Sequence, residues 1–145
     1  SRLYRALVET ELTVGMGGGA QATVDPYLYS VVMLIHPERT PEEALAALDT
    51  EILHVQEEKV SAEEVARAVK QAKALFAYGS ESVTNQAFWM GYAEIFADYD
   101  WFLTYLDKLA AVTPDDVQRV AKKYFQKKAR VVGIYLPVNE EISNE

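Results

Sequence analysis

Apolar residues recur at every third or fourth position along most of the chain, which is the spacing of helices that pack by one face. The first such run begins directly after Ser1, whose side chain is suited to capping a helix. Clearer helical runs follow between residues 40 and 125. The expected helices begin near Ser1, Thr40, Ser61, Val83, Asp100 and Thr113.

Two of these helices carry strong start signals. Thr40 is followed by a proline and then by Glu43, so its hydroxyl and the Glu43 carboxylate are placed to form a reciprocal capping box. The stretch "SAEE", from Ser61 to Glu64, repeats this arrangement ahead of the next helix. Because glycine favours helix ends, we expect that helix to end at Gly79.

Three stretches have the β-branched and aromatic composition of strands. The first is short, residues 12–16, and the glycines at 17–19 are expected to interrupt it. A turn at "VDPY", residues 24–27, leads into a second and well-buried strand over 27–36, which we expect to pair antiparallel with the first. The third predicted strand, residues 129–136, is stopped by a proline.

The order of these elements indicates an α+β fold. Helix, two strands, several helices and one strand predict two layers, with a small, mostly antiparallel sheet and helices packed on one of its faces. We interpret residues 1–137 as one domain and residues 138–145, which include "NEEISNE", as an acidic tail.

Composition narrows the possible partners. The chain has 145 residues, of which 50% are hydrophobic, so a core can form. A net charge of -8 argues against nucleic acid as a partner, because phosphate binding needs a basic face. No run approaches the roughly 18–20 apolar residues that span a bilayer. The absence of cysteine excludes disulfides and thiolate zinc sites, but leaves the compartment open.

The glycine-rich segment "GMGGGA", residues 15–20, matches the spacing of dinucleotide-binding loops. Such a loop must open a helix, so that helix amides meet the pyrophosphate. Here a threonine, a valine and a proline follow within the next six residues instead. We therefore favour a bulged strand, or one that another backbone approaches closely.

Glu51 and His54 have the Glu-x-x-His spacing of di-iron helical bundles. That site needs a second such pair, and the only other histidine, His36, follows a strand pattern and precedes a proline. Two histidines cannot build the site, so we expect His54 on a helix flank and Glu51 in solvent.

Two further patterns favour structural roles. The basic run "KKYFQKKAR", residues 122–130, ends a helix, where cations are stabilised by the helix dipole. The aromatic-dense stretch over residues 85–102 is expected to pack between helices, with Trp101 and Phe102 buried; some of its rings are also suited to a chamber wall or an interface.

The ordered segments "SRLYRALVETELTVG", "TPEEALAALDTEIL", "SAEEVARAVKQAKALF", "TPDDVQRVAKKYF" and "RVVGIYLP" resemble the pitrilysin/insulinase-type zinc metallopeptidase family. The match is to the C-terminal, non-zinc domain of a half-size member, and it covers nearly the whole chain. It implies that a strand and a helix precede "SRLYR" in the same domain.

The resemblance also implies a mechanism for the parent protein. In this family an N-terminal domain holds Zn²⁺ through an H-x-x-E-H motif and a further glutamate, and the motif glutamate acts as general base. The two halves close around a chamber that admits peptides. This chain has no H-x-x-E-H, so the resemblance implies no cofactor here and zinc in the N-terminal partner domain. It also implies a peptide substrate and a homo- or heterodimer.

The family's C-terminal half often supplies an Arg and a Tyr near the substrate. Aligned on "LVETELTVGM", these positions fall on Val8 and Val14, so we expect no catalytic residue in this chain. Valine cannot donate a hydrogen bond to a developing oxyanion. Three functions stay open: a non-catalytic domain of a zinc endopeptidase, a structural subunit of an inactive homologue, and an unrelated helical binding module.

Overall fold

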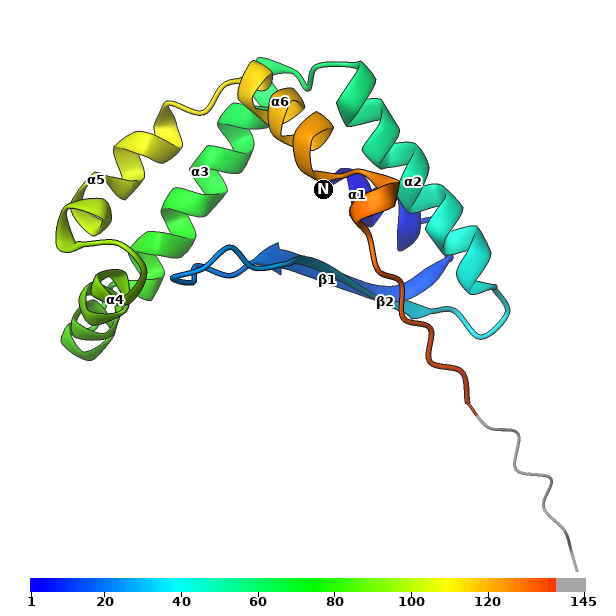
Figure 1. Ribbon diagram of the computed structural model, residues 1–145, viewed down its shortest axis with the longest axis horizontal. Helices are drawn as coiled ribbons and strands as arrows, with labels where there is room; N and C mark the ends of the chain where they lie inside the picture. The colour runs from blue at the N-terminus through cyan, green and yellow to red at the C-terminus, as the bar shows by residue number, and fades with distance from the viewer. Residues whose placement is uncertain (138–145) are drawn as a thin grey trace, which may run out of the picture.

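The computed structural model describes residues 1–137, so the predicted acidic tail lies outside the described residues. Helices form an arch on one side of a β-hairpin and leave its other side uncovered, which confirms the predicted α+β class (Figure 1). None of the described helices is long and apolar enough to cross a membrane. The elements are α1 (Arg2–Leu7), β1 (Thr13–Ala20), β2 (Tyr29–Ile35), α2 (Pro41–Glu57), α3 (Ala62–Gly79), α4 (Val83–Phe96), α5 (Tyr99–Ala110), α6 (Pro114–Tyr124) and a short 3₁₀ turn (Lys127–Ala129).

The capping signals explain where the helices begin. Thr40 and Glu43 form the predicted reciprocal box at the start of α2, with the Thr40 amide donating to the Glu43 carboxylate at 2.8 Å. At α3 the box is one-sided. The Ser61 hydroxyl accepts from the Glu64 amide at 3.1 Å, but the Glu64 carboxylate does not return to the cap. It binds Arg2 instead, and this contact is invisible to a local pattern.

The hairpin differs from its prediction in two respects. β1 continues through the glycines rather than stopping at them, and pairs antiparallel with β2 from Thr13 opposite Ile35 to Ala20 opposite Tyr29. A register shift between Thr13 and Gly15 marks a bulge. β2 is also not well buried, because helices cover only one of its faces. The bulge supports the structural interpretation of the glycine-rich segment over a nucleotide loop.

The predicted third strand, residues 129–136, is wrong. After the 3₁₀ turn the chain has no regular secondary structure up to residue 137, and it pairs with no strand in the described part of the chain. Val131 is 95% exposed and Tyr135 is 94% exposed. A strand forms only where its backbone N–H and C=O groups can pair with those of a neighbouring strand. A strand-like composition does not supply that neighbour.

Most of the tightly packed core lies between α2 and its neighbours. α2 packs against α1 and α6, and the Gln56 side-chain amide of α2 donates to the carbonyls of Ala121 (3.1 Å) and Phe125 (2.8 Å). These bonds satisfy acceptors at the end of α6. The buried residues in the described chain are Leu7, Thr13, Ala44, Leu48, Val60, Ala93 and Ala121.

The helices α3, α4 and α5 pack through aromatic rings. Phe96 of α4 meets Trp101 of α5 edge-on, with 4.8 Å between ring centroids, and Phe76 of α3 lies 5.4 Å from Phe102. This confirms helix–helix packing for the aromatic-dense stretch. The expectation that Trp101 and Phe102 are buried is wrong, since both stay partly exposed and α5 buries no residue fully.

Candidate functional site: the hairpin face and the loop before it

The loop between α1 and β1 is a tight turn. Val8 caps α1 in a helical conformation, and the Leu12 amide then donates to the Leu7 carbonyl at 3.0 Å. Glu11 adopts φ 57°, in the left-handed region, which costs a non-glycine residue about 1–2 kcal/mol. The hydrogen bond and this conformation fix the direction in which the chain enters β1.

Val8 and Val14 stand on the two sides of this turn. Val8 is partly buried at the end of α1, whereas Val14 is half-exposed at the bulge of β1. The Thr13 hydroxyl beside it is buried and has no hydrogen-bond partner among residues 1–137. Both valines have apolar side chains that can neither donate nor accept a hydrogen bond. That these positions correspond to the family's Arg and Tyr stays a prediction.

The uncovered face of the hairpin, which we call the open face, exposes apolar side chains. Gly15 pairs with Leu34 and Gly17 pairs with Val32, and both glycines have open space where a Cβ would stand. Val32 is 70% exposed and Leu34 is 66% exposed on this face. Glycines at alternate positions thus leave the β1 backbone accessible beside two apolar side chains.

The opposite face of β1 shows why one glycine is required. A Cβ on Gly18 would stand 2.7 Å from the carbonyl oxygen of Ser30, and that backbone atom cannot move aside. Gly18 pairs with Val31 and, because successive strand residues alternate between faces, lies on the face opposite to Gly17. The close backbone approach expected for this segment is therefore confirmed at Gly18.

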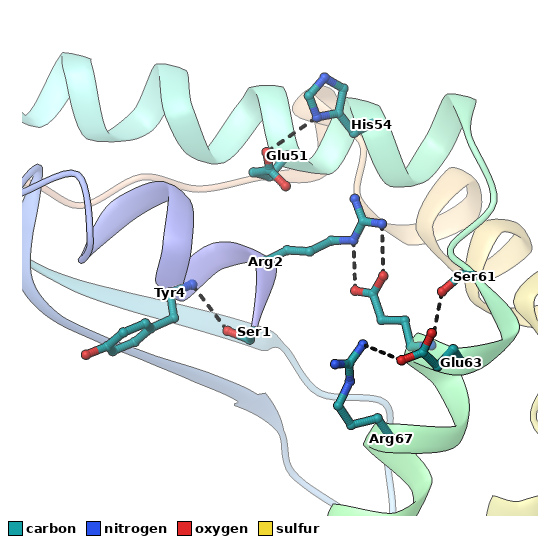
Figure 2. Close-up of polar contacts among 9 residues, drawn as sticks. Ser1, Arg2, Tyr4, Glu51, His54, Ser61, Glu63 and Arg67 are labelled. Carbon is teal, nitrogen blue, oxygen red and sulfur yellow. Dashed lines mark hydrogen bonds and ion pairs between the residues drawn. The ribbon is translucent and has the colours of Figure 1, made fainter.

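A polar cluster joins the start of α1 to α3 (Figure 2). The Arg2 guanidinium donates to both carboxylate oxygens of Glu64, at 2.8 and 2.9 Å. This hydrogen bonding raises the pKa of Arg2 and holds the pKa of Glu64 below its usual value. Bidentate pairing of this kind fixes orientation as well as contributing energy, so it positions α1 against α3.

Glu51 and His54 lie near this cluster on α2 (Figure 2). His54 Nδ1 is 3.4 Å from Glu51 Oε1. The expectation that Glu51 is solvated is wrong, because its side chain is only 20% exposed on the inner side of the helix. No three His, Cys, Asp or Glu side chains within residues 1–137 are arranged to hold a metal. The donors present here therefore do not fit a zinc site, which needs at least three protein ligands.

Part of the basic run at the end of α6 forms ion pairs with α2. Lys122 and Lys123 occupy the last turn of α6, as the helix-dipole interpretation predicts. Lys127 lies 3.0 Å from Asp49 of α2, and Arg130 also binds that carboxylate. Burial raises the pKa of Asp49, but hydrogen bonds from Arg130 and Lys127 outweigh it and the net shift is downward.

Two features of this region were not predicted from the sequence. The alternation of glycines at 15, 17 and 19 was a readable signal, since period two places them on one face of a strand. The pairing of Arg2 with Glu64 had no local signal, because 62 residues separate the partners.

The chain is thus an α+β domain with one open sheet face and, in its described residues, no constellation of metal ligands. The family model for the "Peptidase M16 inactive domain" matches residues 1–72. No curated protein matches the chain.

Solved structures of similar fold cover most of the chain. One is a "putative zinc protease" from Bordetella pertussis Tohama I, with 28% identity, a TM-score of 0.81, and coverage of 94% of this chain and 76% of that chain. Another is the inactive peptidase domain of such a protein from Bordetella parapertussis, with 27% identity, a TM-score of 0.83, and coverage of 94% and 73%. A protease from Helicobacter pylori shares the fold at 18% identity and a TM-score of 0.80, over 87% of this chain and 30% of that chain.

These findings confirm the predicted resemblance. The chain resembles the inactive domain of the peptidase M16 family, and the family model matches its residues 1–72.

Proposed function

We propose that this chain is the non-catalytic domain of a zinc-dependent endopeptidase, and that it helps to enclose the chamber in which peptides are cleaved. The observation that carries this proposal is the open face of the hairpin in a domain of the inactive M16 type. Val32 and Leu34 expose apolar surface beside the accessible β1 backbone. Such a surface suits contact with extended peptides of many sequences.

The side chains of this chain indicate which domain of the longer protein carries out the chemistry. A peptidase of this class needs a metal to activate water. Residues 1–137 offer no metal-binding set, and the resemblance predicts that Val8 and Val14 stand where the family often carries an Arg and a Tyr. Zinc and the general base are therefore assigned to an N-terminal domain of the same longer protein. This chain contributes part of the wall of the peptide-binding chamber and so helps to set the chamber's shape.

The open face is tested in that longer protein by Val32→Asp and Leu34→Asp. We expect each change to raise KM for an unstructured peptide about tenfold, which corresponds to about 1.4 kcal/mol of lost apolar contact, with kcat changed less. Leu53→Asp is the matched control, since Leu53 is a half-exposed leucine on α2. An unchanged KM in both hairpin variants, or an equal rise in the control, contradicts the proposal.

The second candidate, a structural subunit of an inactive homologue, is favoured by the two valines. The zinc content of the longer protein separates the candidates, because a structural subunit needs no stoichiometric zinc and hydrolyses no peptide. Restoring Val8→Arg and Val14→Tyr in this chain alone is expected to produce no hydrolysis, because the metal-bound water is still missing.

A further inference from the structure

The α4 helix is apolar over most of its surface, and α5 covers only part of it. Its only charged residue is Glu94, and only Ala93 is buried. Phe88 is 60% exposed, and Val83 and Ile95 are more exposed still. A helix without a polar face normally lies within a core or an interface. The outer side of α4 therefore has the character of a contact surface.

The neighbouring helix α5 adds a patterned stripe to this surface. Tyr99, Leu103 and Asp107 follow one another at steps of four residues, and Asp100 lies three residues before Leu103. These spacings place the four side chains on one helix face, which we call the α5 stripe. Leu103 is 56% exposed and Tyr99 is also exposed. An apolar side chain is thus flanked by a carboxylate one turn away on each side.

All charged side chains between residues 74 and 107 are acidic. From residue 74 to residue 107 the chain contains no Lys, Arg or His. None of the acidic residues in this span forms an ion pair with another described residue. These acidic residues are Glu81, Glu94, Asp98, Asp100 and Asp107.

We propose that the α5 stripe and the exposed side of α4 dock a cationic amphipathic helix of another polypeptide. Such a helix places a Leu-like side chain on Leu103 and Tyr99 while Lys or Arg one turn to each side meets Asp100 and Asp107. Exposed rings such as Phe88 offer additional faces for these cations. This contact would bury the apolar area of the surface and would pair its carboxylates with cations.

The charges argue against two other occupants. A second copy bound through the same surface would place Asp100 and Asp107 against like charges, which destabilises an interface. A membrane rich in anionic lipid would repel the same carboxylates.

The test uses the whole chain and a synthetic 18-residue helical peptide of Leu and Lys, with the Leu residues on one face and Lys on both flanks. We expect saturable binding by calorimetry at low salt, and at least tenfold weaker binding of an analogue with Glu in place of Lys. Asp100→Asn combined with Asp107→Asn is expected to weaken binding of the Lys peptide about tenfold, and Leu103→Ala to weaken it severalfold.

The matched control is Glu42→Gln combined with Glu63→Gln, which removes two first-turn carboxylates from α2 and α3. It should leave affinity within twofold. The proposal is overturned if the control weakens binding as much as the α5 pair, or if the Glu analogue binds equally well. It is also overturned if sedimentation shows dimers that Asp100→Asn and Asp107→Asn strengthen, or if the chain partitions onto phosphatidylserine vesicles in preference to the peptide.

Discussion

The layer formed by α1, α2 and α6 and the arm formed by α3, α4 and α5 have similar helical patterns but pack differently. The layer contains the fully buried Leu7 and Ala44, and Gln56 joins α2 to backbone acceptors at the end of α6. The arm contains one buried residue, Ala93, and is joined by partly exposed rings. An apolar stripe therefore shows that a helix has a partner surface, but not that the partner lies in the same described chain.

The largest effect is expected where the layer is most tightly packed. Leu7→Ala removes a side chain that is 0% exposed and should lower the free energy of unfolding by about 2–5 kcal/mol. Leu75→Ala in the arm, where the leucine is 72% exposed, should change it by less than about 0.5 kcal/mol. Urea unfolding of both variants measures the contrast, and equal losses would show that the layer and the arm do not differ as described.

A smaller effect is expected in the hairpin below the layer. Gly18→Val forces a Cβ to 2.7 Å from the Ser30 carbonyl oxygen and should cost about 1–3 kcal/mol of stability. Gly17→Val meets open space and should be close to neutral, because valine favours strands. If thermal unfolding shows the two variants to be equally stable, the claim that the β1 and β2 backbones approach closely at Gly18 is wrong.

The junction between layer and arm should respond to acid. The Arg2 contact holds the folded-state pKa of Glu64 below the usual 4.5, so the pair's contribution is fully present above about pH 4.5. It is lost as the pH falls through the lowered pKa. Because both side chains are about one-third exposed, we expect the pair to contribute only about 1 kcal/mol to the free energy of unfolding.

The variant Glu64→Gln should remove this acid-dependent loss, so the wild-type protein and the variant converge in stability as the pH falls towards 3. Glu63→Gln, on the adjacent and more exposed carboxylate, should leave the pH profile unchanged. A Glu64→Gln protein that loses as much stability as the wild type between pH 5 and 3 would exclude the pair as the source.

The sequence predicted much of this fold because its signals are local. Thr40 and Glu43 predicted the start of α2 from four residues, and the resemblance to the inactive M16 domain was confirmed. The errors have one physical origin. Whether residues 129–136 form a strand depends on a neighbouring edge, and whether Glu51 is solvated depends on packing that no local window contains.

The candidate site was less predictable than the fold. The alternation of glycines at 15, 17 and 19 is a local signal for an open strand face that was not used in the prediction, and the cover on the other face comes from helices distant in sequence. The assignment of Val8 and Val14 rests on the resemblance and stays a prediction, as does the expected strand and helix ahead of Ser1.

The central claim is that this chain is the non-catalytic half of a zinc peptidase. It is tested most directly by measuring hydrolysis of an unstructured peptide by the zinc-bearing half of the longer protein, alone and with this chain added. Because misplaced substrate costs on the order of a hundredfold in rate, addition should raise the rate by about that factor, with the zinc bound by the catalytic half unchanged. Full activity of the zinc-bearing half alone, or stoichiometric zinc bound by this chain, would contradict the account.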